Sequence, residues 1–287
     1  MLRRTLTALL LIPPVLYLIG WSPRWLFLLA VVAAVELGLR EFFSLSRHMG
    51  YKTLPGVGYV VGAGLCVAQA PPLGGPQRVA AFVLVPLVLL IPLLALQRST
   101  DLHEYLVATA VTLFGILYIG LTLSCLVPIR FFQPPLSAWY MTRAGQVESA
   151  AGTRLLLLLF LVIWAGDICA YLVGRPLGRR PFFSRISPRK TVEGALAGLA
   201  GSLLAAWAFV HWFWRTADLK TVILIAGWVA LAGQAGDLVE SALKRAANQK
   251  DSGTLLPGHG GFLDRIDSLI FAAPALWLAL VVQGFWS

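Results

Sequence analysis

The feature that most constrains the fold is a series of long, continuous apolar runs. One of them, LLLLLFLVIWAGDICAYLVG at 155–174, contains a single charged residue, Asp167. A helix needs about 20 apolar residues to cross the hydrocarbon core of a bilayer, and the runs lack the apolar–polar alternation of a transmembrane β-barrel. Only 13% of the residues are charged, whereas soluble domains carry about 25%. The sequence therefore predicts an all-α polytopic membrane protein.

Nine such runs predict nine transmembrane helices. The first run follows Arg3 and Arg4 but lacks the small-x-small cleavage site of a secretory signal peptide, so we interpret it as a span. The three cysteines fall singly inside apolar runs, which favours buried side chains over a disulfide framework or a zinc site. The predicted spans are 5–21, 24–44, 54–70, 79–97, 105–127, 154–174, 194–214, 221–245 and 267–285.

The distribution of basic residues predicts the orientation. With nine spans, 16 of the 23 lysines and arginines fall on the side of the N-terminus, which also holds the polar loops 175–193 and 246–266. Cytoplasmic loops carry an excess of Lys and Arg. We therefore expect a cytoplasmic N-terminus, a periplasmic C-terminus and two cytoplasmic polar loops. The two loops share a side even if one span before residue 154 is gained or lost.

No linker is evident in the sequence, so we divide the chain by the position of its polar loops. We expect N-terminal transmembrane helices over 1–150 and a C-terminal transmembrane catalytic region over 151–287, which contains both polar loops. The net charge of +10 is explained by cytoplasmic anchoring and contact with anionic lipid. Nucleic acid is not an expected partner, since the sequence contains no soluble basic domain.

Acidic residues inside predicted spans are costly in a membrane, and each is therefore a functional candidate. Glu36 is followed one helical turn later by Arg40, which favours an ion pair within the helix. Asp167 and Asp237 each end the tripeptide AGD and are each followed by an arginine eight residues later. This similarity is either a faint internal repeat or a coincidence in a chain rich in Ala and Gly.

A polar stripe marks the predicted helix that contains Asp237. The stripe comprises Asp237, Glu240, Ser241 and Lys244, at spacing i, i+3, i+4 and i+7. This spacing places all four side chains on one helix face. Such a stripe can serve only to join helices, but this one continues directly into a polar loop, which favours a functional site.

The loop that follows, in the stretch KRAANQKDSGTLLPGHGGFLDRIDS at 244–268, has the composition of a metal–phosphate site. Glycines allow a ligand to approach the backbone, and free N–H groups bind phosphate oxygens. Lysines and arginines add charge-assisted contacts, and aspartates supply the oxygen ligands that Mg²⁺ prefers beside phosphates. The P-loop pattern GxxxxGK[ST] is absent. The candidates are Lys244, Arg245, Lys250, Asp251, His259, Gly260, Gly261, Asp264, Arg265 and Asp267, with a purely structural role left open for His259.

The other polar loop has a similar character. The stretch GRPLGRRPFFSRISPRKTVEG at 174–194 carries five arginines and Lys190. Its arginines alone are explained by cytoplasmic anchoring. The segment SPRKTVEG, however, stands at the entrance of a predicted helix, where free N–H groups favour anions. The candidates for substrate binding there are Ser187, Lys190, Thr191 and Glu193.

At this level of detail the sequence resembles a known family. The 27 residues SALKRAANQKDSGTLLPGHGGFLDRID at 241–267 resemble the signature of the phosphatidate cytidylyltransferases (CDP-diacylglycerol synthases), without a departure. The segments SPRKTVEG and GDLVES are also similar to segments of that family, and the informative resemblance covers about 160–268. It implies a reaction of CTP with phosphatidic acid that gives CDP-diacylglycerol and pyrophosphate. It also implies Mg²⁺ as cofactor, a nine-span helical fold, a homodimer and the bacterial inner membrane.

The resemblance also implies roles for the candidate residues. We expect Asp237 and Asp264 to bind Mg²⁺, with Asp251 and Asp267 as further ligands or as residues that orient them. A second cation is left open. Phosphates would be held by Lys244, Arg245, Lys250 and Arg265, with catalytic contacts also assigned to His259. The expected substrate-binding residues are Ser187, Lys190, Thr191, Glu193, Ser241, Gly260 and Gly261.

Three alternative functions are weighed against this one. A polyprenol or diacylglycerol kinase-like enzyme would transfer the γ-phosphate and release a nucleoside diphosphate, and the match at 241–267 argues against it. A transporter could use the acids inside the membrane, but it leaves the dense polar loop unexplained. A non-catalytic lipid-binding scaffold would retain its function after the substitution Asp264→Ala.

Overall fold

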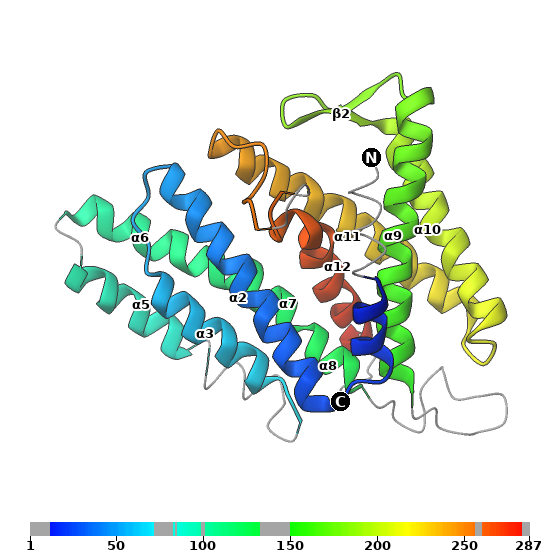
Figure 1. Ribbon diagram of the computed structural model, residues 1–287, viewed down its shortest axis with the longest axis horizontal. Coiled ribbons are helices and arrows are strands. Elements are labelled where there is room, and N and C mark those ends of the chain that lie inside the picture. The colour runs from blue at the N-terminus through cyan, green and yellow to red at the C-terminus, as the bar shows by residue number, and fades with distance from the viewer. Residues whose placement is uncertain are drawn as a thin grey trace. The chain divides into compact units, whose positions relative to one another are not determined.

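The computed structural model describes residues 12–71, 83, 85–98, 101–132, 150–255 and 260–282, and most of them are helical (Figure 1). Residues 12–20 form a helix that precedes α2. The other elements are α2 (Arg24–His48), α3 (Pro55–Ala68), α5 (Val85–Arg98), α6 (Leu102–Gly115), η2 (Ile116–Leu121, π-helical), α7 (Thr122–Ser124), α8 (Leu126–Arg130), α9 (Ala151–Leu177), β1 (Pro181–Phe183), β2 (Ser187–Thr191), α10 (Val192–Trp212), α11 (Leu219–Ala246) and α12 (Leu263–Val282).

The helices support the predicted membrane protein at a coarse level. Within the described residues, five helical stretches are long and apolar enough to cross a membrane: Leu102–Arg130, Ala151–Leu177, Val192–Trp212, Leu219–Ala246 and Leu263–Val282. They coincide with the last five predicted spans. The four earlier predicted spans overlap helices that are shorter or more polar, so the count of nine and the orientation stay predictions.

The chain forms two compact units, and their limits differ from the expected division at residue 150. Unit 1 comprises 1–128 and 243–266, and unit 2 comprises 129–242 and 267–287. The polar loop 246–266 therefore packs with the N-terminal helices, not with the region 151–242 that precedes it in sequence. The physical reason is a buried carboxylate of α2, Glu41, which accepts hydrogen bonds from this loop.

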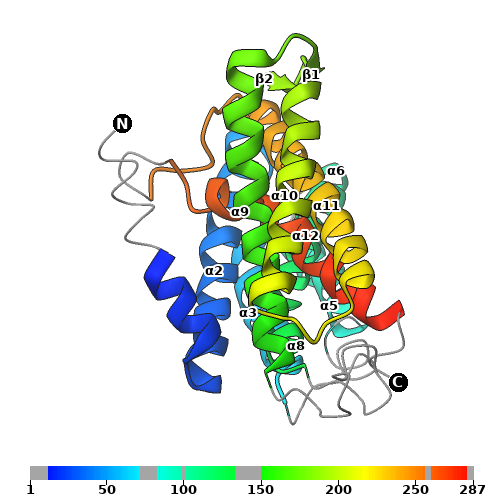
Figure 2. The same cartoon turned by 90° about the vertical axis from the view of Figure 1, so that its right-hand side faces the viewer.

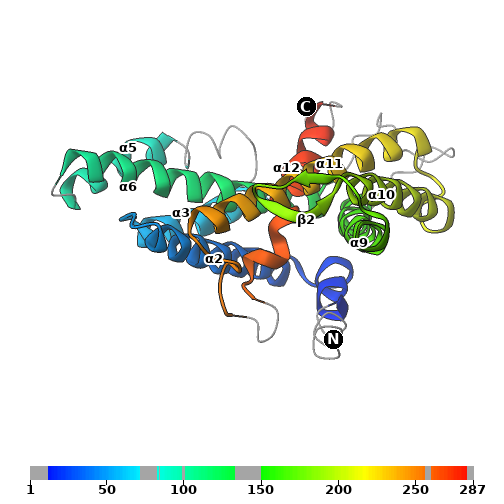
Figure 3. The same cartoon turned by 90° about the horizontal axis from the view of Figure 1, so that it is seen from above.

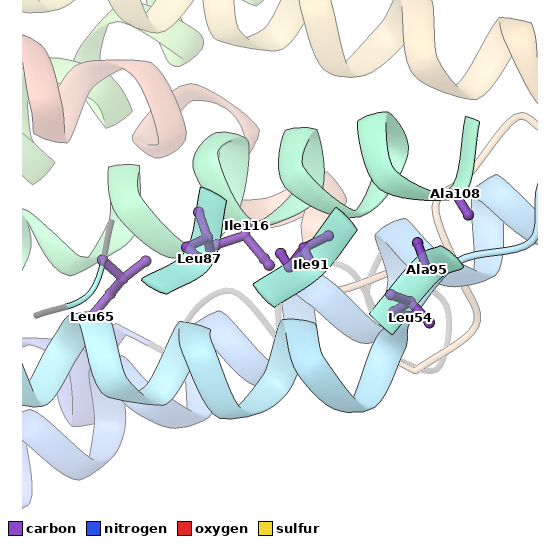
Figure 4. Packing of buried hydrophobic residues seen from close by; sticks show 7 residues of the cluster. All are labelled: Leu54, Leu65, Leu87, Ile91, Ala95, Ala108 and Ile116. Carbon is purple, nitrogen blue, oxygen red and sulfur yellow. The ribbon is translucent and has the colours of Figure 1, made fainter. Parts of the chain in front are cut away.

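Unit 1 is held together by aromatic and aliphatic side chains that pack against glycines. Helices α2 and α3 lie together, as do α5 and α6 (Figure 3). A β-carbon at Gly62 of α3 would lie 2.8 Å from a methyl carbon of Leu39, and one at Gly115 of α6 would collide with Phe42. These glycines therefore let α2 approach closely. A second buried cluster consists of Leu54, Leu65, Leu87, Ile91, Ala95, Ala108 and Ile116 (Figure 4).

Unit 2 is built around the pair α9 and α10, which lie side by side (Figure 2). Small residues line the contact: a β-carbon on Gly194 would lie 3.1 Å from the Cα atom of Gly174. The Ser202 hydroxyl of α10 donates a hydrogen bond of 2.8 Å to the carbonyl of Val162 in α9. Small residues and hydroxyl–carbonyl bonds of this kind bring membrane helices together without a hydrophobic driving force.

A β-hairpin joins α9 to α10 in the region 175–193, where the sequence predicts a loop. Helix α9 continues to Leu177, and strands β1 and β2 then pair antiparallel with Phe183 opposite Ser187. The hairpin is a short addition to a chain whose other described elements are helices, which agrees with the predicted all-α class. The hairpin holds Lys190 on β2, next to the N-terminus of α10 (Figure 1).

Candidate active site

The first polar cluster lies in unit 2 and centres on Asp237. Lys190 of β2 forms an ion pair with Asp237 of α11, and both side chains are about one-third exposed. Helix α12 approaches α11 closely there, because a β-carbon on the neighbouring Gly236 would lie 2.6 Å from the carbonyl oxygen of Asp267. Two residues that the sequence assigns to phosphate and metal binding, 47 positions apart in the chain, are thus in direct contact.

Negative charge is concentrated around this ion pair. Asp267 lies within electrostatic range of Asp237, Glu240 and Asp167, and Asp167 in turn interacts with Asp237 and Lys190. The side chain of Glu240 is completely buried. We call Asp167, Asp237, Glu240 and Asp267 the acidic cluster. Mutual repulsion among neighbouring carboxylates, one of which is buried, is unfavourable unless a cation offsets it, so this cluster fits a cationic ligand.

Two residues beside Lys190 tie the hairpin to α10: Thr191, the last residue of β2, and Glu193, in the first turn of α10. The Thr191 hydroxyl caps α10 by accepting a hydrogen bond of 3.2 Å from the N–H of Gly194. The Glu193 Oε2 atom accepts bonds of 3.1 and 3.2 Å from the N–H groups of Arg179 and Arg180. In this structure, therefore, the Thr191 and Glu193 side chains stabilise the backbone on either side of the hairpin that carries Lys190. Their assignment to substrate binding stays a prediction, as does that of Ser187.

The second polar cluster lies in unit 1 and centres on Asp264, in the first turn of α12. Its Oδ1 atom accepts a hydrogen bond of 2.6 Å from the Lys244 ammonium group. Its Oδ2 atom accepts bonds of 3.0 Å from the N–H of Ser252 and 2.8 Å from the N–H of Gly261. Only 8% of the Asp264 side chain is exposed. Asp264 therefore fastens the polar loop to α12 and to the end of α11.

Glycine is required at position 260 for the loop to close over Asp264. Gly260 has a φ angle of +83°, a conformation that costs an L-residue energy. A β-carbon at this position would also lie 2.8 Å from the Oδ2 atom of Asp264. Gly261 is buried, and a β-carbon on it would collide with Ser252 and Glu41. At these two positions, the close contacts that require glycine are thus with other residues of the protein.

Glu41 is a residue of this cluster that the sequence analysis missed. Its carboxylate accepts hydrogen bonds from the Ser252 hydroxyl and from the N–H groups of Phe262 and Leu263. A usable signal existed, because Glu41 is an acid inside the predicted span 24–44, the same criterion that selects Glu36. The ion pair predicted for Glu36 is wrong: among the described residues, Glu36 Oε1 is buried without a hydrogen-bond partner and Arg40 is exposed.

The remaining predicted site residues occupy various environments. Ser241 is buried on α11. The Arg245 guanidinium donates a hydrogen bond of 3.0 Å to the carbonyl of Gln249. Three further residues, Lys250, Asp251 and Arg265, are exposed. His259 lies outside the described residues, so its assignment stays a prediction.

The match to a family model decides what kind of protein this is. A model described as "Cytidylyltransferase family" matches residues 2–283. The chain belongs to the cytidylyltransferase family. The match includes both compact units and both polar clusters.

Three relatives of this cytidylyltransferase family member share one name. The chain is 34% identical over 273 residues to the phosphatidate cytidylyltransferase of Synechocystis sp., which covers 90% of the chain and 89% of the relative. It is 30% identical over 283 residues to the phosphatidate cytidylyltransferase of Staphylococcus aureus, covering 97% and 98%. A match to the enzyme of that name in Bacillus subtilis is 46% identical over 122 residues, or 42% and 45%.

The acidic cluster of this family member is suited to Mg²⁺ only with help from a substrate. Among the residues that the structure describes, no three His, Cys, Asp or Glu side chains are arranged to hold a metal ion by themselves. Mg²⁺, however, is usually bound by one or two carboxylates together with water and substrate phosphates. The carboxylates of Asp237 and Asp267, close to two further acids, fit that mode of binding.

Proposed function

We propose that this chain is a phosphatidate cytidylyltransferase, which uses CTP and phosphatidic acid to form CDP-diacylglycerol and pyrophosphate. The observation that carries the proposal is the contact of Lys190 with Asp237 inside the acidic cluster. It joins a phosphate-binding type of side chain to a metal-binding type, in a chain whose relatives of that name match over 90% and 97% of its length.

The chemistry requires no covalent enzyme intermediate. An oxygen of the lipid phosphate attacks the α-phosphorus of CTP and forms a new P–O bond. The bond between the α-phosphorus and the oxygen that bridges to the β-phosphorus breaks, and pyrophosphate carries away the electron pair. Because the phosphate monoester is already a nucleophile, catalysis consists of positioning the two substrates and neutralising charge.

Within unit 2, the acidic cluster and Lys190 have complementary roles. When bound, Mg²⁺ supplies positive charge to the phosphate oxygens. Asp237 and Asp267 are the residues that would hold it. Lys190 binds a phosphate oxygen beside them, and Thr191 and Glu193 keep the Lys190 backbone in place. Glu240, which is buried, and Asp167 increase the negative potential that favours a cation.

Within unit 1, Lys244 and Asp264 organise the polar loop. The predicted role of Asp264 as a metal ligand competes with the three hydrogen bonds from Lys244, Ser252 and Gly261 that its carboxylate accepts. We propose that Arg245, Lys250 and Arg265 bind phosphates from the exposed side of this loop. The Asp251 side chain, also exposed, is proposed to orient a ligand, and a second cation and His259 stay in the proposal as predicted from the sequence.

We further propose the location and partners that the resemblance implies. The protein is a multi-pass protein of the bacterial inner membrane, with its polar loops in the cytoplasm where CTP is available. It acts as a homodimer, and it takes phosphatidic acid from the bilayer. The coarse support is the set of five apolar helices and the bacterial origin of the relatives.

The deciding experiment measures pyrophosphate release by the purified protein in detergent with phosphatidic acid, Mg²⁺ and each nucleoside triphosphate in turn. We expect lipid-dependent release with CTP alone, lost in Asp237→Asn. If Asp237→Asn retains full activity, the proposed role of Asp237 is wrong while the reaction stands. If the folded wild-type protein releases no pyrophosphate with any of the nucleotides, the proposed function is wrong. A liposome flux assay without nucleotide then tests the transporter alternative.

A further inference from the structure

A buried carboxylate outside both predicted polar loops is hydrogen-bonded to one of them. Glu41 lies on α2, in the last third of the helix, and is only 6% exposed. Its Oε1 atom accepts a hydrogen bond of 2.8 Å from the N–H of Phe262, and its Oε2 atom accepts one of 2.8 Å from the N–H of Leu263. These N–H groups belong to the start of α12, where the helix dipole favours a negative charge.

The backbone of the loop is shaped to admit this carboxylate. A β-carbon on Gly253 would lie 2.6 Å from Glu41 Oε1, and one on Gly261 would also collide with the Glu41 carboxylate. Two glycines more than 200 positions after Glu41 therefore make room for its side chain. The loop backbone therefore approaches the Glu41 carboxylate more closely than any residue with a β-carbon would allow.

Ser252 connects Glu41 to Asp264. The Ser252 hydroxyl lies 2.7 Å from Glu41 Oε2 and 3.1 Å from Asp264 Oδ2, so its single proton serves one carboxylate at a time. The N–H of the same serine donates to Asp264 Oδ2 over 3.0 Å. A displacement of Glu41 would therefore move Ser252, Asp264 and the first turn of α12 together.

We propose that Glu41 is a positioning residue for the cytidylyltransferase reaction, which holds the polar loop and Asp264 in the geometry that transfer requires. The inference rests on the proposed function. Glu41 itself touches no substrate and acts through Ser252 and the start of α12. Misplacement of a catalytic segment by about 1 Å can lower a rate roughly 100-fold, so the expected effect is on turnover.

The test compares Glu41→Gln with the wild type in steady-state kinetics, normalised to the folded fraction from size exclusion and thermal unfolding in detergent. The amide group of the variant turns one acceptor into a donor that faces backbone N–H groups. We expect kcat to fall at least about tenfold, with the KM for phosphatidic acid changed less than about twofold. A general loss of stability would lower the folded fraction but not kcat per folded enzyme.

Matched variants separate positioning from other effects. Glu36→Gln changes another acid of α2, whose Oε1 atom has no hydrogen-bond partner among the described residues, and it should retain wild-type kcat. Glu41→Asp keeps the carboxylate and should recover part of the loss. Ser252→Ala should lower kcat less than Glu41→Gln, and the double variant should lose less than the product of the single losses, since both act on Asp264.

A second readout does not depend on activity. Hydrogen exchange at the amides of Phe262 and Leu263 should be slow in the wild type and at least about tenfold faster in Glu41→Gln, because their acceptors are weakened. Unchanged exchange, or unchanged kcat in folded Glu41→Gln and Ser252→Ala, would overturn the proposal. If the wild-type protein shows no cytidylyl transfer, the proposed function has failed, and exchange alone decides whether Glu41 positions the loop.

Discussion

At the scale of single residues, the two polar clusters use their carboxylates differently. Asp264 is surrounded by donors, and its oxygens accept bonds from Lys244, Ser252 and Gly261. Asp237 forms an ion pair with Lys190 and stands among other acids. A carboxylate whose donors come from the loop and the adjoining end of α11 stabilises that loop, whereas an acid surrounded by other acids favours a cation. We therefore propose the second environment, around Asp237, as the metal site.

The proposed phosphate contact of Lys190 can be tested with one substitution that removes its charge and one that keeps the charge but changes the shape. Lys190→Ala should lower kcat/KM with CTP by roughly 100-fold, because the loss of one donor to a developing phosphate charge has effects of that order. Lys190→Arg keeps the charge and should lose less. The measurement is the rate of pyrophosphate release over a series of CTP concentrations. Equal activity of all three proteins would show that Lys190 is not a phosphate ligand.

Gly260 can be compared with a glycine of the same conformation. Gly260 and Gly50 have φ angles of +83° and +81°, but a β-carbon on Gly50 would meet no atom within 4 Å. Both alanine variants should lose about 1–2 kcal/mol from backbone strain. Gly260→Ala should unfold at a lower temperature than Gly50→Ala and lose activity, because it also displaces Asp264. Equal unfolding temperatures and full activity would contradict this role.

At the scale of elements, the contact between α9 and α10 carries the hairpin that presents Lys190. A β-carbon on Gly198 of α10 would lie 3.0 Å from the carbonyl of Gly166 in α9. The side chain of Gln234 in α11 donates a hydrogen bond of 3.0 Å to the carbonyl of Ala195, one turn earlier. Small residues thus let three helices of unit 2 meet, and larger ones would separate them.

Gly198→Val should separate α9 from α10 and move the hairpin relative to Asp237. Overpacking of this kind typically costs about 1–3 kcal/mol, and the activity of the folded protein should also fall. Gly227→Ala is the control, because its nearest atom would lie at an ordinary contact distance of 3.6 Å. Thermal unfolding in detergent and pyrophosphate release measure the two effects. A Gly198→Val variant as stable as the control would refute the packing argument.

The start of α11 depends on pH through Asp218. Its carboxylate accepts hydrogen bonds of 2.9 and 2.6 Å from the N–H and hydroxyl of Thr221, and these hold the pKa of Asp218 below its ordinary value of 3.8. A lowered folded-state pKa means that the stabilisation is present above pH 3.8 and is lost as the pH falls through the folded value. Asp218→Ala should therefore reduce the unfolding temperature at pH 7, and this difference should shrink below about pH 4.

At the scale of the whole molecule, the two units do not follow the order of the chain. Residues 243–266, which run from the last turn of α11 to the first turn of α12, belong to unit 1. The residues that precede and follow this segment belong to unit 2. Helices α11 and α12 therefore each contribute to both polar clusters. The sequence predicts that both polar loops face the cytoplasm, irrespective of one span more or fewer before residue 154.

Cysteine labelling tests this orientation. Single cysteines replacing the exposed residues Arg185 and Lys250, in a background without the three native cysteines, should react with a membrane-impermeant thiol reagent in inverted vesicles. They should be protected in right-side-out vesicles, because both positions are expected in the cytoplasm. Reaction of the two positions from opposite sides would overturn the predicted topology.

Much of the identity of this protein follows from its sequence. The apolar runs predict membrane helices because a bilayer demands continuous hydrophobic length, and the residues 241–267 point to the cytidylyltransferase family, which the comparisons confirm. These signals are local along the chain. They needed no knowledge of which helices pack together.

Long-range contacts were decided only by the tertiary structure. The pairing of Lys190 with Asp237, the hairpin that carries Lys190, and the bonds from the polar loop to Glu41 each join segments that no spacing rule relates. A helix pattern shows which side chains share a face, but not which partner covers that face. For this reason the sequence by itself determined the membrane-helical class and the family, and its choice of reactive residues stays a prediction. Only the tertiary structure decided that a carboxylate on α2 fastens the loop to the start of α12, because hydrogen bonds form between groups that packing brings together.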